Sequence, residues 1–193
     1  MTGDDFLCPF CRAPAPSSDE EIIEMNTKRM EMGDPRAMCS QGCHYSEGRY
    51  GLPRDSVKAL ELLHRAGELG YTDPYFNIGL CYMSGNGVGR DEKKAIHYWE
   101  LAAIGGNVSA RHNLGCSDGN AGNYDRALKH FMIAVGSGDK DSLTTIQQMY
   151  KNGHATKDKY AKALQAYQAY LDEVKSDDRD KAAAHREDNK YYE

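Results

Sequence analysis

Residues 73–106 read DPYFNIGLCYMSGNGVGRDEKKAIHYWELAAIGG, and this stretch predicts the fold because three further segments of the chain follow the same pattern. Internal repetition at this length is the signature of stacked supersecondary units. A small residue opens the first half of each copy, at Ala37, Pro74, Ala110 and Ser142. Alanine opens the second half, directly after a basic residue, at Ala59, Ala95, Ala127 and Ala163.

In the first half of each copy, the fourth residue after the small residue is a core position. In three copies the residue directly after this core position is glycine. The pairs are Gln41-Gly42, Ile78-Gly79, Leu114-Gly115 and, without glycine, Ile146-Gln147. Small residues let the first helix approach its partner closely, and glycine past the end of a helix adopts the left-handed conformation that caps it. A hairpin of this length cannot bury its apolar face alone, whereas stacked copies can, so the sequence predicts a short solenoid.

At these residues the chain resembles the Sel-one-like repeat, a relative of the tetratricopeptide repeat. The resemblance implies an all-α fold, a right-handed α-solenoid of about four helix-turn-helix repeats with a capping helix at each end. The repeats are expected at 34–70, 71–106, 107–138 and 139–173. Copies three and four depart from the family pattern, because NAGNYD replaces the glycine-rich turn in one and Gln147 replaces the glycine in the other.

The segments outside the repeats are expected to be a linker and two caps. Residues 18–33 begin with a capping box, Ser18 to Glu21, and continue as the N-terminal capping helix. Residues 174–193 are charged, and we expect a second capping helix there, with a disordered tail as the alternative. Residues 1–17 pair two cysteines with a proline-broken linker, RAPAPS.

Composition argues against two classes of partner. The net charge is −5, whereas a nucleic-acid-binding surface would be basic. No apolar run reaches the roughly 18 residues of a membrane span, and the N-terminal residues lack the basic and apolar regions of a signal peptide. We therefore expect a cytoplasmic or nuclear protein that contacts neither nucleic acid nor membrane and keeps its 6 cysteines reduced.

Cys8 and Cys11 have the spacing that grips zinc, but a structural zinc site needs four ligands. CPFCRAPAP resembles the end of a RING-type zinc finger, which implies a truncated remnant of that finger. Zinc would then bind at Cys8 and Cys11 only if other ligands were supplied. One alternative is a thiol pair without a role, and another is a site completed by Cys39 and Cys43, which share one helix face.

No catalytic motif accompanies the 7 histidines of the chain. The stretch GNGVGR at 85–90 follows a helix and lacks the Lys-Ser/Thr of a phosphate-binding loop, so it is interpreted as a turn. We therefore expect no enzymatic activity and no cofactor. An enzyme with an unrecognised site in the groove is the remaining alternative.

The resemblance also nominates a partner-binding surface, because first helices line the concave face in this superfamily. Their i,i+4 pairs lie on one face, and Cys39 and Cys43 hold these positions in the first copy. The pairs in the other copies are Phe76, Leu80, His112, Cys116, Thr144 and Gln148. None is a lysine or an arginine, so the strip suits an extended peptide or a helix of another protein.

The sequence therefore predicts a non-enzymatic scaffold or adaptor that binds another protein. The alternative is a fragment of a RING-type ubiquitin ligase, whose repeats would select the substrate. A longer form of such a ligase would also bind a ubiquitin-conjugating enzyme.

Overall fold

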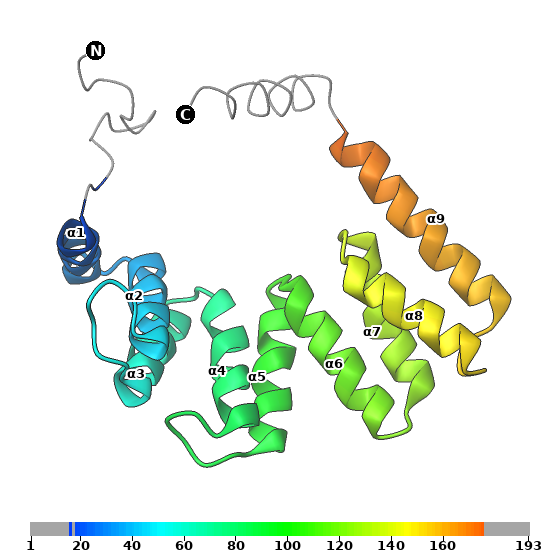
Figure 1. Cartoon of the computed structure of the whole chain (residues 1–193), viewed down its shortest axis with the longest axis horizontal. Helices are drawn as coiled ribbons and strands as arrows, with labels where there is room; N and C mark the ends of the chain where they lie inside the picture. Colours follow the sequence, from blue (N-terminus) through cyan, green and yellow to red (C-terminus); the bar gives the residue numbers. More distant parts are fainter. Residues whose placement is uncertain (1–15, 17, 176–193) are drawn as a thin grey trace. The chain divides into compact units, whose positions relative to one another are not determined.

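The computed structural model describes residues 16 and 18–175, and every regular element within them is an α-helix (Figure 1). The chain divides into two compact units between Gly105 and Gly106. The first unit contains α1 (Asp19–Glu31), α2 (Pro35–Glu47), α3 (Ser56–Glu68), α4 (Asp73–Ser84) and α5 (Glu92–Ile104). The second contains α6 (Val108–Asn120), α7 (Tyr124–Gly136), α8 (Lys140–Lys151) and α9 (Lys157–Val174).

Each helix packs against the next one along the chain within its unit. In the first unit α2 packs on α3, α3 on α4 and α4 on α5, and α2 also contacts α4. In the second unit α6 packs on α7, α7 on α8 and α8 on α9, and α7 also contacts α9. These stacked hairpins confirm the predicted all-α solenoid class.

The repeat glycines lie where the two helices of a hairpin come closest. A Cβ atom on Gly79 would lie 2.4 Å from the Trp99 ring, and one on Gly115 would lie 2.7 Å from the Phe131 ring. The aromatic side chain of the second helix therefore occupies the space that a side chain on the first helix would need. Close packing of this kind is the predicted role of these glycines.

The repeat alanines are inaccessible to solvent. Exposure is 0% at Ala59, Ala66, Ala95, Ala102, Ala127, Ala134 and Ala163. On the same second helices Gly67 lies against Tyr75 of α4, with only 2.6 Å between a Cβ there and the ring. Small residues on α3 thus leave room for α4 to dock on it.

The turns differ between the hairpins in the way the sequence suggests. Gly85 and Gly87 adopt φ of 77° and 78° in the glycine-rich turn after α4. The Lys94 Nζ atom lies over the Tyr82 ring, 5.2 Å from the ring centroid. This contact joins the ends of the two helices. Where the third copy has Asp118 in place of tyrosine, the corresponding base, Arg126, forms an ion pair with it at 3.5 Å.

The first helix, α1, packs on α2 through a polar contact that the sequence analysis did not foresee. Ser18 caps the helix as predicted and accepts a hydrogen bond from the Glu21 amide. The buried side chain of the helix is Asn26, which donates to the Gln41 side chain at 3.4 Å. Gln41, the polar residue at a core position of the first repeat, therefore has a polar partner, as a buried polar side chain requires.

The predictions for the ends of the chain concern residues that the structure does not describe. The Cys8 and Cys11 pair lies outside the described residues, and so does the predicted cap or tail beyond Lys175. Among the helices that are described, none combines the length and the apolar character needed to cross a membrane.

Candidate functional site: two grooves beside the first helices

The first unit contains a small groove between α2 and α4, with a volume of about 150 Å³. Cys43 and Leu63 lie in its wall, and Asn77 donates a hydrogen bond to the Cys43 sulfur at 3.5 Å. The Asn77 amide therefore ties the two first helices together. The remaining lining residues are Ser46, Glu47, Leu80, Cys81, Ser84 and Asn86.

The glycine-rich turn positions one end of this groove. A Cβ on Gly87 would lie 2.6 Å from the Ser56 side chain, so the turn packs directly on the start of α3. Ser56 also donates a hydrogen bond to the Asn86 side chain at 2.8 Å. The turn therefore brings Asn86 to the groove, a lining residue that the sequence analysis assigned only to a loop.

Cys39 and Cys43 form a thiol pair beside the groove. A hydrogen bond with Cys43, together with burial, raises the pKa of Cys39. The same hydrogen bond lowers the pKa of Cys43, which places the first ionisation of the pair on the more exposed sulfur. Among the residues that the structure describes, no group of three or more His, Cys, Asp or Glu side chains could hold a metal ion.

The second unit contains a larger groove beside α6 and α8, with a volume of about 290 Å³. Its apolar part comes from Phe131 and Met149, which are otherwise buried in the core of the unit. Side-chain amides and hydroxyls supply the polar part. The full lining is Gly115, Cys116, Gly119, Asn120, Tyr124, Phe131, Thr145, Gln148, Met149, Asn152 and His154.

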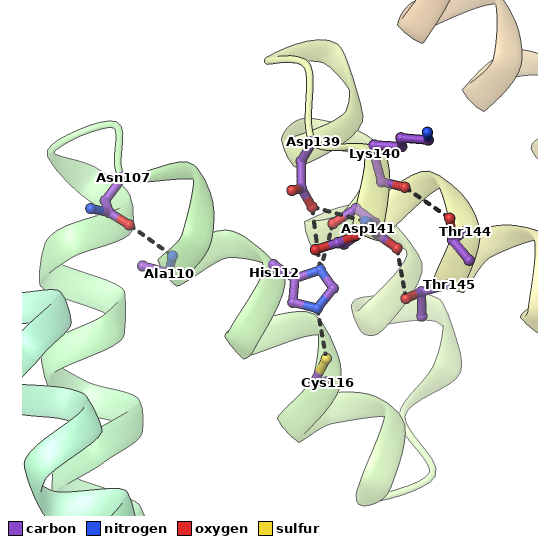
Figure 2. Close-up of polar contacts among 10 residues, drawn as sticks. Asn107, Ala110, His112, Cys116, Asp139, Lys140, Asp141, Thr144 and Thr145 are labelled. Atoms are coloured by element: carbon purple, nitrogen blue, oxygen red, sulfur yellow. Dashed lines mark hydrogen bonds and ion pairs between the residues drawn. The ribbon is translucent and has the colours of Figure 1, made fainter.

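A chain of polar contacts runs behind Cys116 (Figure 2). The Nε2 atom of His112 lies 3.4 Å from the Cys116 sulfur, one turn along α6. Its Nδ1 atom lies 2.8 Å from the Ser142 hydroxyl and 3.3 Å from an Asp139 carboxylate oxygen. Asp139 is fixed as the N-cap of α8, because the same oxygen accepts the Ser142 backbone N–H at 2.9 Å.

The repeat packing determines where the imidazole of His112 lies. Phe131 fills the space beside Gly115, and its ring centroid is 5.4 Å from that of His112. The close approach of α6 and α7 at the repeat glycine thus places an aromatic surface against the histidine. A bulkier residue at position 115 would displace this ring.

The residues nominated from the sequence fall into three groups. Leu80, Cys116 and Gln148 line the two grooves, whereas His112 contacts Cys116 from behind. Phe76 is half-buried on α4, and Thr144 is exposed with its hydroxyl bonded to the Lys140 carbonyl.

Two lining residues of the second groove, Tyr124 and His154, were not indicated by the repeat pattern. Tyr124 and His154 stack at a centroid distance of 3.7 Å. They come from the start of α7 and from the turn after α8, so no single helix period relates them. The change of the third copy's turn to NAGNYD was the available signal, because it places Tyr124 where the first two copies have Ser56 and Glu92.

Comparison with known proteins supports the resemblance to the Sel1 repeat. The family model described as Sel1 repeat matches residues 35–71 and 75–107, which is less than half of the chain. Two solved structures are similar over most of it. A Sel1 repeat protein from Oxalobacter formigenes is 26% identical with a TM-score of 0.65, covering 80% of this chain and 62% of that one.

The second structure is a protective antigen of uropathogenic Escherichia coli with an SLR fold, 26% identical with a TM-score of 0.68. It covers 79% of this chain and 33% of that one. Among curated proteins, a segment of 98 residues is 33% identical to the ERAD-associated E3 ubiquitin-protein ligase component HRD3B of Arabidopsis thaliana. This chain spans 15% of the length of that relative.

Proposed function

We propose that the chain is a protein-interaction module that binds short peptide segments in the grooves beside its first helices. One observation carries the proposal. In each unit a groove opens beside first helices, and residues nominated from the repeat pattern line it. The Sel1-repeat resemblance supports the proposal, because proteins built from these repeats are interaction scaffolds.

The size and chemistry of the grooves favour side chains of a peptide over a small-molecule ligand. Their volumes, about 150 and 290 Å³, lie below the range of about 300–1,000 Å³ typical of small-molecule pockets. Asn77, Asn120 and Gln148 offer amide groups that can pair with a peptide backbone. No lysine or arginine lines either groove, so a partner would be held by shape, apolar anchors and backbone contacts.

Two leucine variants test the first groove. Peptides selected on the purified chain from a random display library serve as probes, and their affinity is measured by fluorescence anisotropy. Leu80→Glu places a charge in the groove at a residue that is 40% exposed. Leu164→Glu on α9 is the matched control, because that leucine is 43% exposed and lies outside the linings of both grooves.

We expect Leu80→Glu to weaken binding by at least tenfold, about 1.4 kcal/mol, and the control to leave affinity unchanged. The Gln148→Ala variant tests the second groove with the same peptides. Equal affinities in all variants would show that the selected peptides bind elsewhere, and the proposed grooves would be wrong.

A second candidate function is a substrate-selecting part of a ubiquitin ligase. The similarity to a ubiquitin-ligase component over half of this chain favours it. The candidate gains a direct role in ligation only if Cys8 and Cys11 hold zinc with further ligands. Zinc content of the purified chain and of a Cys8→Ser/Cys11→Ser variant tests this point. We expect no zinc in either, and one zinc per chain lost in the variant would favour the ligase role.

A further inference from the structure

We propose that Cys116 is a nucleophilic thiol, assisted by His112 and Asp139, that accepts an acyl group from a thioester entering the second groove. The observation behind this proposal is the order of the three side chains (Figure 2). A thiol, an imidazole and a carboxylate follow one another through the two ring nitrogens. This is the arrangement in which a nucleophile is activated by a base that a third group orients.

The carboxylate beside Nδ1 of His112 favours the tautomer with the proton on that nitrogen. The Asp139 carboxylate only accepts hydrogen bonds, so the neighbouring Nδ1 of His112 must be protonated to pair with it. The Ser142 hydroxyl at 2.8 Å can accept from the same N–H. Nε2 is then the unprotonated nitrogen, and it lies 3.4 Å from the Cys116 sulfur, within reach of the thiol proton.

The same geometry argues against a metal site at these residues. Cys116 and Asp139 contact opposite nitrogens of the imidazole. Ligands of one metal ion must converge on a single point, and the two ring nitrogens of one histidine point in different directions. The three side chains therefore form a relay for a proton.

Cys116 is accessible from the groove. Its side chain is half-buried and lines the groove together with Phe131 and Met149. Cys39 and Cys81, in the first unit, are buried. An acyl chain can lie on the apolar part of the second groove, while the amides of Asn120 and Gln148 can donate to the acyl oxygen.

The surroundings of Cys116 explain why it would need a base. Burial and the nearby Asp139 carboxylate raise the pKa of the Cys116 thiol, so little thiolate forms unaided. The titratable side chains that line the groove with Cys116 are Tyr124 at the start of α7 and His154 after α8. Asp118 on α6 pairs with His130 on α7 at 3.6 Å. The half-buried Cys43 of the first unit differs, because its hydrogen bond with Cys39 lowers its pKa.

The proposed step balances without an oxidant or a reductant. The Cys116 sulfur attacks the thioester carbonyl carbon while His112 Nε2 takes the thiol proton. The new carbon–sulfur bond replaces the old one, and the departing thiolate takes the proton from the imidazolium. Cys116 is left as an S-acyl cysteine, one per chain, and one free thiol is released.

The test follows acylation at each cysteine separately by peptide-resolved mass spectrometry. The purified full chain is treated with S-acetyl-N-acetylcysteamine from pH 5.5 to 9.5, and iodoacetamide serves as a second electrophile. Variants are His112→Gln, Asp139→Asn and Cys116→Ser. Asn caps a helix about as well as Asp, so Asp139→Asn keeps the α8 cap while removing the charge.

We expect the rate at Cys116 at pH 7 to fall at least tenfold in His112→Gln and about threefold or more in Asp139→Asn. Rates at Cys43, the internal reference, should stay within twofold. A base that takes the thiol proton changes how the rate depends on pH. The wild-type pH profile at Cys116 should therefore differ from the profiles of both variants, an effect that a structural role would not produce.

Two results would overturn the proposal. One is an unmodified Cys116 in the folded wild-type chain while Cys43 reacts. The other is a Cys116 rate and pH profile that both variants leave unchanged. Thermal melts of each variant show whether it is folded, and if His112→Gln unfolds, Asp139→Asn alone decides.

Discussion

The hairpins α4–α5 and α8–α9 follow the same repeat pattern but are packed differently at the position of the repeat glycine. In α4–α5, Gly79 leaves room for Trp99, which is only 4% exposed. In α8–α9, Gln147 replaces the glycine, and Tyr167 at the position of the tryptophan is half-buried. Accordingly α5 fully buries four side chains, whereas α9, although longer, buries only Ala163. The repeat glycine thus leaves room for a large side chain of the second helix, Trp99 in this hairpin and Leu63 beside Gly42 in α2–α3.

The largest expected effect comes from removing the two aromatic side chains in turn. Trp99→Ala should lower the free energy of unfolding by about 3–5 kcal/mol, because it leaves a cavity between α4 and α5. Tyr167→Ala should cost less than about 2 kcal/mol, because the tyrosine is already half in water. Urea denaturation followed by circular dichroism measures both values, and equal costs would contradict the comparison.

Substitutions at the glycine position of the first helix test the same packing contact. Gly79→Ala should destabilise by about 1–3 kcal/mol, because the added methyl group would overlap the Trp99 ring. Gln147→Ala should change stability by less than about 0.5 kcal/mol, since that side chain is not buried. Alanine favours helix over glycine, so a stabilising Gly79→Ala would show that the hairpin is less tightly packed than the structure indicates.

The repeat pattern predicted the packing of the hairpins because the positions concerned are set by helix geometry. The small residues, the core positions and the glycines all follow from the need of one helix to lie close to another. Thus Ala110, Leu114 and Gly115 are all buried on α6.

The groove linings could be predicted only in part, because they combine residues from helices with residues from turns. Leu80, Cys116 and Gln148 follow the helix period and were predicted. Asn86 and His154 come from turns whose path depends on contacts such as that of Gly87 with Ser56. The relay behind Cys116 needs Asp139, which lies beyond α7 in the chain and reaches His112 only because α8 docks beside α6.

A second departure from the pattern is Gln41, in the core of the first repeat. Unlike Gln147, Gln41 is compensated by a partner, because its side chain accepts a hydrogen bond from Asn26. Gln41→Leu restores the apolar residue of the other copies but removes the acceptor for Asn26. We expect a loss of about 1–2 kcal/mol, because Asn26 is buried and keeps only the Ser40 hydroxyl at 3.4 Å. The double variant Asn26→Leu/Gln41→Leu should recover most of this loss in urea denaturation. A double variant as unstable as the sum of both single variants would contradict the pairing.

The smallest expected effect concerns the N-cap residues of α2 and α6. Asp34 caps α2 and Asn107 caps α6, so only the former cap carries a charge. Hydrogen bonds from Arg29 to one Asp34 oxygen, at 2.9 and 2.7 Å, lower the pKa of that carboxyl. A lowered pKa in the folded state gives stability above the unfolded value near 3.8, and this stability is lost as the pH falls through the folded value.

Asp34→Asn makes the α2 cap resemble that of α6, since Asn and Asp cap helices about equally well. The pair with Arg29 is largely exposed, so the variant should be less stable at pH 7 by no more than about 0.5 kcal/mol. Melting temperatures from pH 7 to pH 2.5 measure the difference, which should close below about pH 4 as the wild-type carboxyl is protonated. A difference that persists at pH 2.5 would mean that the two caps differ in geometry and not in charge.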